Sequence, residues 1–230
     1  MANKISKLKK ENLSKVDATK TYELLDAIKL AKKATSAKFD QSVDLIFNLN
    51  LDTRKADQQL RGSIELPEGT GKDIKVLATS DIPDQLKAAK TSGADLIADS
   101  QELTEILKKG VFNFDVIVAT PKMMMTLGKF GKLLGPKGLM PNPKTGTVTP
   151  NLEKAVKSLK SGKANYRTDK EGNVHTMIGK QSFDDEKLVK NANTIIELIN
   201  KLKPKTTKGT YIKNIVVKTT MGASVKVKFN

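Results

Sequence analysis

The sequence predicts two domains: a discontinuous α+β domain from both chain ends, and an inserted three-layer α/β domain with a parallel sheet. The first observation is that apolar residues alternate with mostly polar ones in 43–51, and that this pattern returns after residue 161. The second is that short apolar runs alternate with helical stretches from 67 to 160, a rhythm typical of parallel sheets flanked by helices. We therefore expect one domain to interrupt the other.

The predicted boundaries lie where glycine and proline punctuate the chain. The outer domain is expected to comprise residues 1–66 and 161–230, and the inserted domain residues 67–160. Glycine permits backbone conformations closed to other residues, so hinges are expected near 67–71 and 160–163. The hinge candidates are Pro67, Gly69, Gly71 and Gly162.

The first outer segment is expected to hold two helices and then two strands. Residues 4–15 mix lysines with spaced apolar residues, which indicates a short amphipathic helix or a basic arm. A helix is predicted over 22–34, where apolar residues recur at helical spacing and lysines gather near the end that favours cations. Strands are predicted over 43–51 and 61–66.

The inserted segment is expected to alternate three strands with helices. The predicted strands are 74–78, 96–98 and 116–119, and the predicted helices are 84–91, 101–109, a lysine-rich 122–134, and 152–159. The final outer segment is expected to hold strands at 165–168 and 174–178 around a polar turn, a helix at 184–202 that stops before Pro204, and a hairpin of 211–218 with 224–229.

The composition restricts the function classes. A formal charge of +16 on 230 residues indicates nucleic acid first and an anionic membrane surface second. With no cysteine and a single histidine, His175, we expect no disulfide scaffold, no metal site and a reducing, intracellular setting. No apolar run is long enough for a membrane span, and the basic amino terminus lacks the apolar core of a secretory signal.

Positive charge is concentrated in one loop. Residues 121–165 hold nine lysines against one acidic residue, whereas 67–120 hold six lysines against nine acidic residues. Within this basic stretch, 128–150 contains five glycines and four prolines, which describes a tightly folded loop. Its charges are Lys129, Lys132, Lys137 and Lys144, and they suit a phosphate-bearing partner. The alternative is a structural connector with solvated lysines.

Several local patterns carry no chemistry. The segment Gly69 to Lys72 lacks the first glycine of a phosphate-binding loop, and Asp73 replaces its magnesium-binding hydroxyl, so we interpret it as a hinge. Two G-x-x-G matches in the basic loop are too short to indicate an RNA-binding loop. No carboxylate pair or nucleophile motif is present, so no enzymatic activity and no cofactor are expected.

Two positions are better suited to binding RNA. Phe39 follows Lys38 just before a strand, where the ring could stack on a base while the lysine meets phosphate. Thr220, Met221 and Gly222 occupy a predicted hairpin tip, where glycine permits close backbone approach. The alternatives are a packed residue at the domain edge for Phe39 and an ordinary turn for the tip.

The run LGPKGLMPNPKTGTVT, from Leu134 to Thr149, resembles the signature of the family of large-ribosomal-subunit protein one, found in the mobile stalk at the tRNA exit site. The resemblance extends over essentially the whole chain. It is also carried by Ala37–Asp40, Asp57–Gly62, Gly93–Asp95, Thr168–Gly179 and Lys218–Val225. It implies a cytoplasmic protein of the large subunit that is not an enzyme and is monomeric outside the ribosome.

The resemblance also implies partners and a site. The partners are large-subunit stalk rRNA, deacylated exit-site tRNA whose movement and release the protein assists, and the mRNA of its own operon, whose translation it can repress. The RNA-binding residues implied on the outer domain are Lys38, Phe39, Ser42, Asp169, Lys170, Gly172, His175, Asn214, Thr220, Met221 and Gly222. Ser42 stands where the family often has Thr, Asn214 where it has Ser, and Ala223 where it has Pro.

Two other function classes stay open from the residues alone. A nucleotide-dependent enzyme would need a glycine fingerprint after the first strand of the inserted domain, and residues 79–85 have none. A generic RNA-binding protein or RNA chaperone, held by charge without a specific site, would also account for the charge of +16.

Overall fold

The protein is described by a computed structural model that covers residues 7–17, 19–110, 112–204, 206–207 and 209–229. The chain divides into two compact units. The first unit consists of Met1–Gly71 with Ala164–Asn230, and the second of Lys72–Lys163. No helix among the described residues combines the length and the apolar character needed to cross a membrane.

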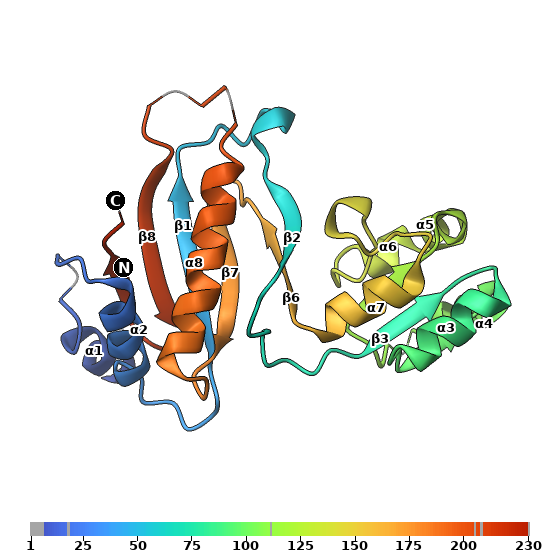
Figure 1. Cartoon of the computed structure of the whole chain (residues 1–230), viewed down its shortest axis with the longest axis horizontal. Coiled ribbons are helices and arrows are strands. Elements are labelled where there is room, and N and C mark those ends of the chain that lie inside the picture. The colour runs from blue at the N-terminus through green and yellow to red at the C-terminus, as the bar shows by residue number, and fades with distance from the viewer. Residues whose placement is uncertain (1–6, 18, 111, 205, 208, 230) are drawn as a thin grey trace. The chain divides into compact units, whose positions relative to one another are not determined.

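A four-stranded antiparallel sheet forms the centre of the first unit. Its strand order is β7 (Asn173–Lys180), β1 (Ser42–Leu49), β8 (Ile212–Thr219) and β9 (Ser224–Val227). Two helices, α2 (Leu24–Lys33) and α8 (Asp185–Lys201), pack on one face, and Figure 1 shows α8 running along the direction of the strands. The strands at the two ends of the chain therefore meet in one sheet.

Alternation in β1 separates the core from solvent. The buried side chains Val43, Leu45, Phe47 and Leu49 pack with the apolar side of α8, and the residues between them are only half-buried. Full burial of such a side chain stabilises the fold by about 1.5–3 kcal/mol. The period-two pattern thus fixes which face of the sheet is covered and which is left open.

Smaller elements complete the first unit. They are α1 (Lys7–Ser14), the 3₁₀ turn η1 (Ala56–Gln58), and the two-stranded sheet of β2 (Arg61–Glu65) and β6 (Lys163–Arg167). Gly62 packs against Tyr166 so closely that a Cβ at this position would overlap the phenol ring.

The second unit has three layers. Its parallel sheet has the order β4 (Leu96–Ala98), β3 (Val76–Thr79) and β5 (Val116–Ala119). One core holds α3 (Pro83–Thr91) and α7 (Leu152–Lys160) against the sheet, and the other core holds α4 (Ser100–Lys109). Alternate residues of β3 serve the two cores, Val76 and Ala78 in one and Leu77 in the other. The predicted fold class is confirmed.

One predicted helix is wrong. In place of a continuous helix over 122–134, the chain forms the 3₁₀ turn η2 (Pro121–Met123), then α5 (Met124–Lys129) and α6 (Gly131–Leu134). Phe130 leaves the helical conformation, with φ −101° and ψ 13°. Glycines at 128 and 131 flank it, and glycine lowers helix stability by about 1 kcal/mol relative to alanine. Most other elements begin and end within two residues of the predicted bounds.

Candidate nucleic-acid interface

The open face of the four-stranded sheet is a polar platform. Three residues of β1 that point away from the core, Asp44, Ile46 and Asn48, have a cross-strand neighbour on both sides. Asn48 lies opposite Asn173 and Asn214, and its Nδ2 donates a hydrogen bond to Asn173 Oδ1 at 2.7 Å. The row formed by these three residues offers donors and acceptors of the kind that read unpaired bases.

Two further rows cross the platform. Ile46 lies opposite His175 and Val216, and Asp44 lies opposite Met177 and Lys218. The side chains in these rows are exposed or half-buried. The face therefore combines apolar, cationic and hydrogen-bonding groups, a mixture suited to single-stranded or looped RNA rather than to phosphates alone.

Phe39 and Met221 belong to the end of the platform where β1 begins. The backbone N–H of Thr220 donates to the carbonyl oxygen of Ser42 at 3.1 Å, which brings the turn between β8 and β9 to this end. The Phe39 side chain is 54% exposed and that of Met221 is 62% exposed. Phe39 is therefore not the packed edge residue considered as its alternative. Large apolar side chains this exposed are candidates for stacking on a ligand.

The backbone around both side chains is firmly held. Asp40, next to Phe39, accepts hydrogen bonds from Ser182 N at 3.0 Å and Ser182 Oγ at 2.9 Å. Gly222 follows Met221, and a Cβ there would overlap the buried Thr219 Oγ1 and come within 3.4 Å of the Ala34 carbonyl oxygen. The φ of Gly222 lies outside the left-handed region, so its backbone conformation does not require glycine. The close approach of Thr219 and Ala34 is the reason that a side chain does not fit here.

The second group of predicted site residues lies at the other end of the platform. Asp169, Lys170 and Gly172 form the turn that enters β7, whose first residue pairs with Asn48 near the end of β1. The eight residues of β1 separate the two groups by about 23 Å at the rise of an antiparallel strand. His175 lies between them, on the face itself.

Asp169 organises its turn. Its Oδ1 accepts from Asn173 N at 2.7 Å and from Glu171 N at 2.9 Å, while Oδ2 accepts from Asn173 Nδ2 at 3.0 Å. Partial burial opposes ionisation, yet these hydrogen bonds outweigh it and lower the pKa of Asp169 below its ordinary value. Gly172 has a φ of +84°, and a Cβ there would lie 3.0 Å from the Leu49 carbonyl oxygen.

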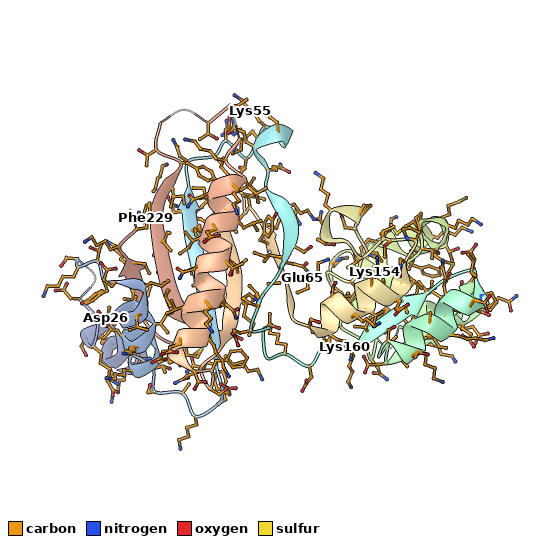
Figure 2. All side chains as sticks on the ribbon, viewed as in Figure 1. Asp26, Lys55, Glu65, Lys154, Lys160 and Phe229 are labelled. Carbon is orange, nitrogen blue, oxygen red and sulfur yellow. The ribbon has the colours of Figure 1, made fainter. Side chains whose placement is uncertain are left out.

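An open recess of about 980 Å³ adjoins this turn. Segments 50–58, 170–171 and 206–207 contribute its walls, and Figure 2 labels Lys55 beside η1 in this region. Arg54, Lys55 and Lys170 line it together with two acidic residues, Asp52 and Glu171. The recess gives the Asp169 end of the platform a charged margin.

The basic loop of the second unit is structured. Thr147 and Thr149 flank Val148 and exchange backbone hydrogen bonds with Ala119 of β5 at 2.9 and 3.1 Å. Asn142 Oδ1 accepts from Lys144 N at 2.8 Å and so holds the following turn. The loop therefore continues the edge of the parallel sheet and is not a free connector.

All four lysines of the loop have exposed side chains: Lys129, Lys132, Lys137 and Lys144. The Nζ of Lys137 lies 4.0 Å from the ring centroid of Phe112, so this lysine has an aromatic partner. The other three present their charge from short helices and turns.

Residues of the open face that the sequence reasoning missed include Asp44, Asn48, Asn173 and Lys218. The alternation in 43–51 could have predicted Asp44 and Asn48, because every second residue of a half-buried strand faces away from the core. Strand order supplied the rest, and no local pattern gives that.

Comparison with known proteins decides the family. The model of the ribosomal protein L1p/L10e family matches residues 30–223. Large ribosomal subunit protein uL1 of Metamycoplasma arthritidis (strain 158L3-1) is 58% identical over 230 residues, which is 100% of both chains. The uL1 protein of Mycoplasmopsis agalactiae (strain NCTC 10123 / CIP 59.7 / PG2) is 60% identical over 215 residues, covering 94% of this chain and 93% of the other. The chain belongs to the ribosomal protein L1p/L10e family.

Membership of this family confirms the resemblance drawn from the Leu134–Thr149 signature. It makes the chain a structural protein of the cytoplasmic large ribosomal subunit, and it excludes the nucleotide-dependent enzyme considered from sequence. The uL1 protein of Mycoplasmopsis pulmonis (strain UAB CTIP), 57% identical over 227 residues and 99% of both chains, supports the same conclusion.

Proposed function

We propose that the open face of the first unit binds a folded segment of large-subunit stalk rRNA. The observation that carries this proposal is that Phe39 and Met221 expose their side chains from a backbone held at one end of the platform. A backbone that is already held lowers the entropic cost of ordering these side chains on binding. In this arrangement the two side chains stack on bases or sugars, while Lys38, Lys170 and Lys218 meet phosphates.

The second part of the proposed site consists of the row of three asparagines and the turn that contains Asp169. Asn214, Asn48 and Asn173 can hydrogen-bond base edges, and His175 lies one row away. An RNA segment that reaches both ends of β1 spans about 23 Å, the length of eight strand residues. We expect such a segment to be a folded element, because two separated groups must be met at once.

The second unit is proposed to contact deacylated tRNA as it leaves the exit site, through the basic loop at 128–150. Its four lysines are exposed, and residues 147–149 of the loop pair with Ala119 of β5, which supports a structured rather than a free presentation of this charge. The two units are proposed to act as separate domains joined by the connectors near 67–71 and 160–163, with the first holding rRNA and the second reaching tRNA.

The same rRNA-binding face is proposed to bind the mRNA of the protein's own operon and so repress its translation. Because one face would serve both RNAs, the two must compete. A leader segment of that mRNA that binds without displacing the rRNA fragment would contradict a shared site.

The test is titration of the full chain with a folded stalk rRNA fragment and with an unrelated hairpin of equal length, at several salt concentrations. Specific recognition predicts a preference of about a thousandfold or more that persists at moderate salt. Phe39→Ala and Met221→Ala are expected to reduce this preference and leave binding of the unrelated hairpin unchanged. Met125→Ala is the matched control, since Met125 is 82% exposed in the other unit.

Equal affinities for the two RNAs, both falling steeply with salt, would instead support the second candidate, a generic basic RNA-binding protein without a specific site. The formal charge of +16 is the observation that favours this second candidate. It would account for the binding if Phe39→Ala and Met221→Ala left the affinity for both RNAs unchanged.

A further inference from the structure

Two buried amide side chains hold the backbone of Met221 from both sides. The Met221 N–H donates to Gln41 Oε1 at 2.8 Å, and the Met221 carbonyl oxygen accepts from Asn12 Nδ2 at 3.2 Å. Asn12 lies in α1, 209 positions away in the sequence, and Gln41 lies just before β1. Both polar groups of one exposed residue are therefore satisfied by side chains from distant segments.

Each amide is itself oriented by other partners. Gln41 is fully buried, and its Nε2 donates to Thr35 Oγ1 at 2.6 Å and lies 3.3 Å from Gln181 Oε1. Asn12 is 4% exposed, and its Oδ1 accepts from Ser36 Oγ at 3.3 Å. These partners determine which end of each amide faces Met221, so neither side chain can turn without losing a second hydrogen bond.

The Met221 side chain, in contrast, is unconfined. It is 62% exposed and belongs to the turn that links β8 to β9, where Gly222 N donates to Thr219 O at 3.2 Å. A turn of this kind fixes its own backbone weakly. The hydrogen bonds with Asn12, which donates, and with Gln41, which accepts, supply what the turn lacks, because they hold the peptide groups on both sides of the Met221 Cα.

We propose that Asn12 and Gln41 are positioning residues of the RNA interface, which they serve by presenting Met221 to the RNA in a fixed orientation. The inference rests on the proposed rRNA-binding function. It gives α1, which lies outside residues 30–223 matched by the family model, a role in recognition without contact to the nucleic acid. Holding a contact residue in its bound conformation lowers the entropic cost of binding.

The experiment compares the ratio of Kd values for an unrelated hairpin and the stalk rRNA fragment, at one salt concentration, in full-length variants. Asn12→Ala is expected to reduce this ratio about tenfold, and Asn12→Leu, which keeps the branched shape of the side chain but not its hydrogen bonds, is expected to reduce it similarly. The ratio is chosen because a general loss of stability would weaken both affinities, whereas lost presentation of Met221 weakens only one.

Asn191→Ala is the matched control. Asn191 is a fully buried asparagine of the same unit that also hydrogen-bonds backbone groups, but these groups are in 68–69 and β7 rather than at Met221. This variant is expected to lower the melting temperature and leave the ratio unchanged. A ratio that falls equally in Asn191→Ala and Asn12→Ala would overturn the proposal, because the effect would then follow stability.

A double-mutant cycle decides whether Asn12 acts through Met221. In the Met221→Ala background, Asn12→Ala is expected to cause no further loss of selectivity. Independent, multiplying losses would overturn the proposal, as would an unchanged ratio in both Asn12 variants beside a reduced one in Met221→Ala. If the wild-type chain shows no preference for the stalk rRNA fragment, the proposed function itself fails. This outcome can be distinguished from the two results that overturn only the positioning role.

Discussion

Asn191 of α8 donates a hydrogen bond from Nδ2 to the carbonyl oxygen of Gly69 at 3.0 Å. The same amide donates to Ile178 O at 2.8 Å and accepts from Glu68 N at 3.1 Å. Gly71 continues this contact, since a Cβ there would lie 2.8 Å from the Phe183 ring. The connector predicted as a hinge is thus held to the first unit through Gly71, and we expect any bending to begin at residue 72.

Asn191→Ala is expected to destabilise the first unit by about 2–3 kcal/mol, because backbone groups at three positions, of which the Ile178 carbonyl is buried, lose their partner. Urea unfolding monitored by circular dichroism would measure the change. Hydrogen exchange at the Glu68 amide should also become faster. An unchanged free energy of unfolding would mean that water replaces the lost hydrogen bonds at no cost.

Gly172→Ala is expected to cost about 1–2 kcal/mol, because alanine at a φ of +84° is strained and the Leu49 carbonyl oxygen lies close by. Gly209→Ala is a matched control, since Gly209 has a φ of +76° and no heavy atom within 4 Å of an added Cβ. The difference between the two variants in thermal unfolding reports the crowding at Gly172. Equal costs would show that backbone strain alone matters.

Gly222→Ala is expected to reduce RNA selectivity more than it reduces the stability of the fold. Its Cβ would overlap Thr219 Oγ1, a buried hydroxyl for which no described residue provides a hydrogen-bond partner. The turn must shift to make room, which moves Met221. We expect reduced selectivity for stalk rRNA with a smaller loss of stability than Gly172→Ala causes, measured by the same titration and unfolding experiments.

The sequence predicts what depends on local periodicity. Alternation in 43–51 predicted the strand and its buried face, and short apolar runs predicted the parallel sheet, because both patterns are set by burial within a few residues. Strand order, and hydrogen bonds from a side chain to a remote backbone group, depend on contacts between distant segments. The contact of Asn12 with Met221 spans 209 positions, and no pattern near either residue announces it.

The prediction of one continuous lysine-rich helix over 122–134 was wrong for a related reason. Spaced apolar residues over 122–134 favour a helix, but Gly128 and Gly131 weaken it, and burial of Leu127 and Leu134 in one core favours a turn at Phe130. Phe39 shows the converse case. Its residue type is compatible with packing at the domain edge as well as with stacking on a base, and only the exposure of its side chain separates the two interpretations.

Replacing Lys129, Lys132 and Lys144 together by alanine is expected to lower the affinity of the protein for tRNA. If each lysine meets one phosphate, the slope of log K against log salt should fall by about two to three. The control replaces the exposed Lys90, Lys108 and Lys109 of the same unit, which changes the net charge equally. Equal losses in both triple variants would assign the binding to net charge and not to the loop.

Tyr211 predicts the response of the fold to alkaline pH. Burial, with a smaller contribution from Tyr166, raises the pKa of Tyr211 to about 12, and no described residue provides a hydrogen-bond partner for its buried hydroxyl. The unfolded chain releases this proton near pH 10 while the folded chain keeps it. Stability contributed by the neutral phenol is therefore complete below pH 10 and declines as the pH rises toward 12.

Tyr211→Phe should remove this decline, and it should raise the free energy of unfolding at pH 7 by about 1 kcal/mol, because an unsatisfied buried hydroxyl is lost. Urea unfolding of wild type and variant from pH 7 to 11.5 tests both expectations. The two free energies should diverge above pH 10, with the variant falling less steeply. Parallel curves through this range would show that the Tyr211 hydroxyl ionises as readily in the folded protein as in the unfolded chain.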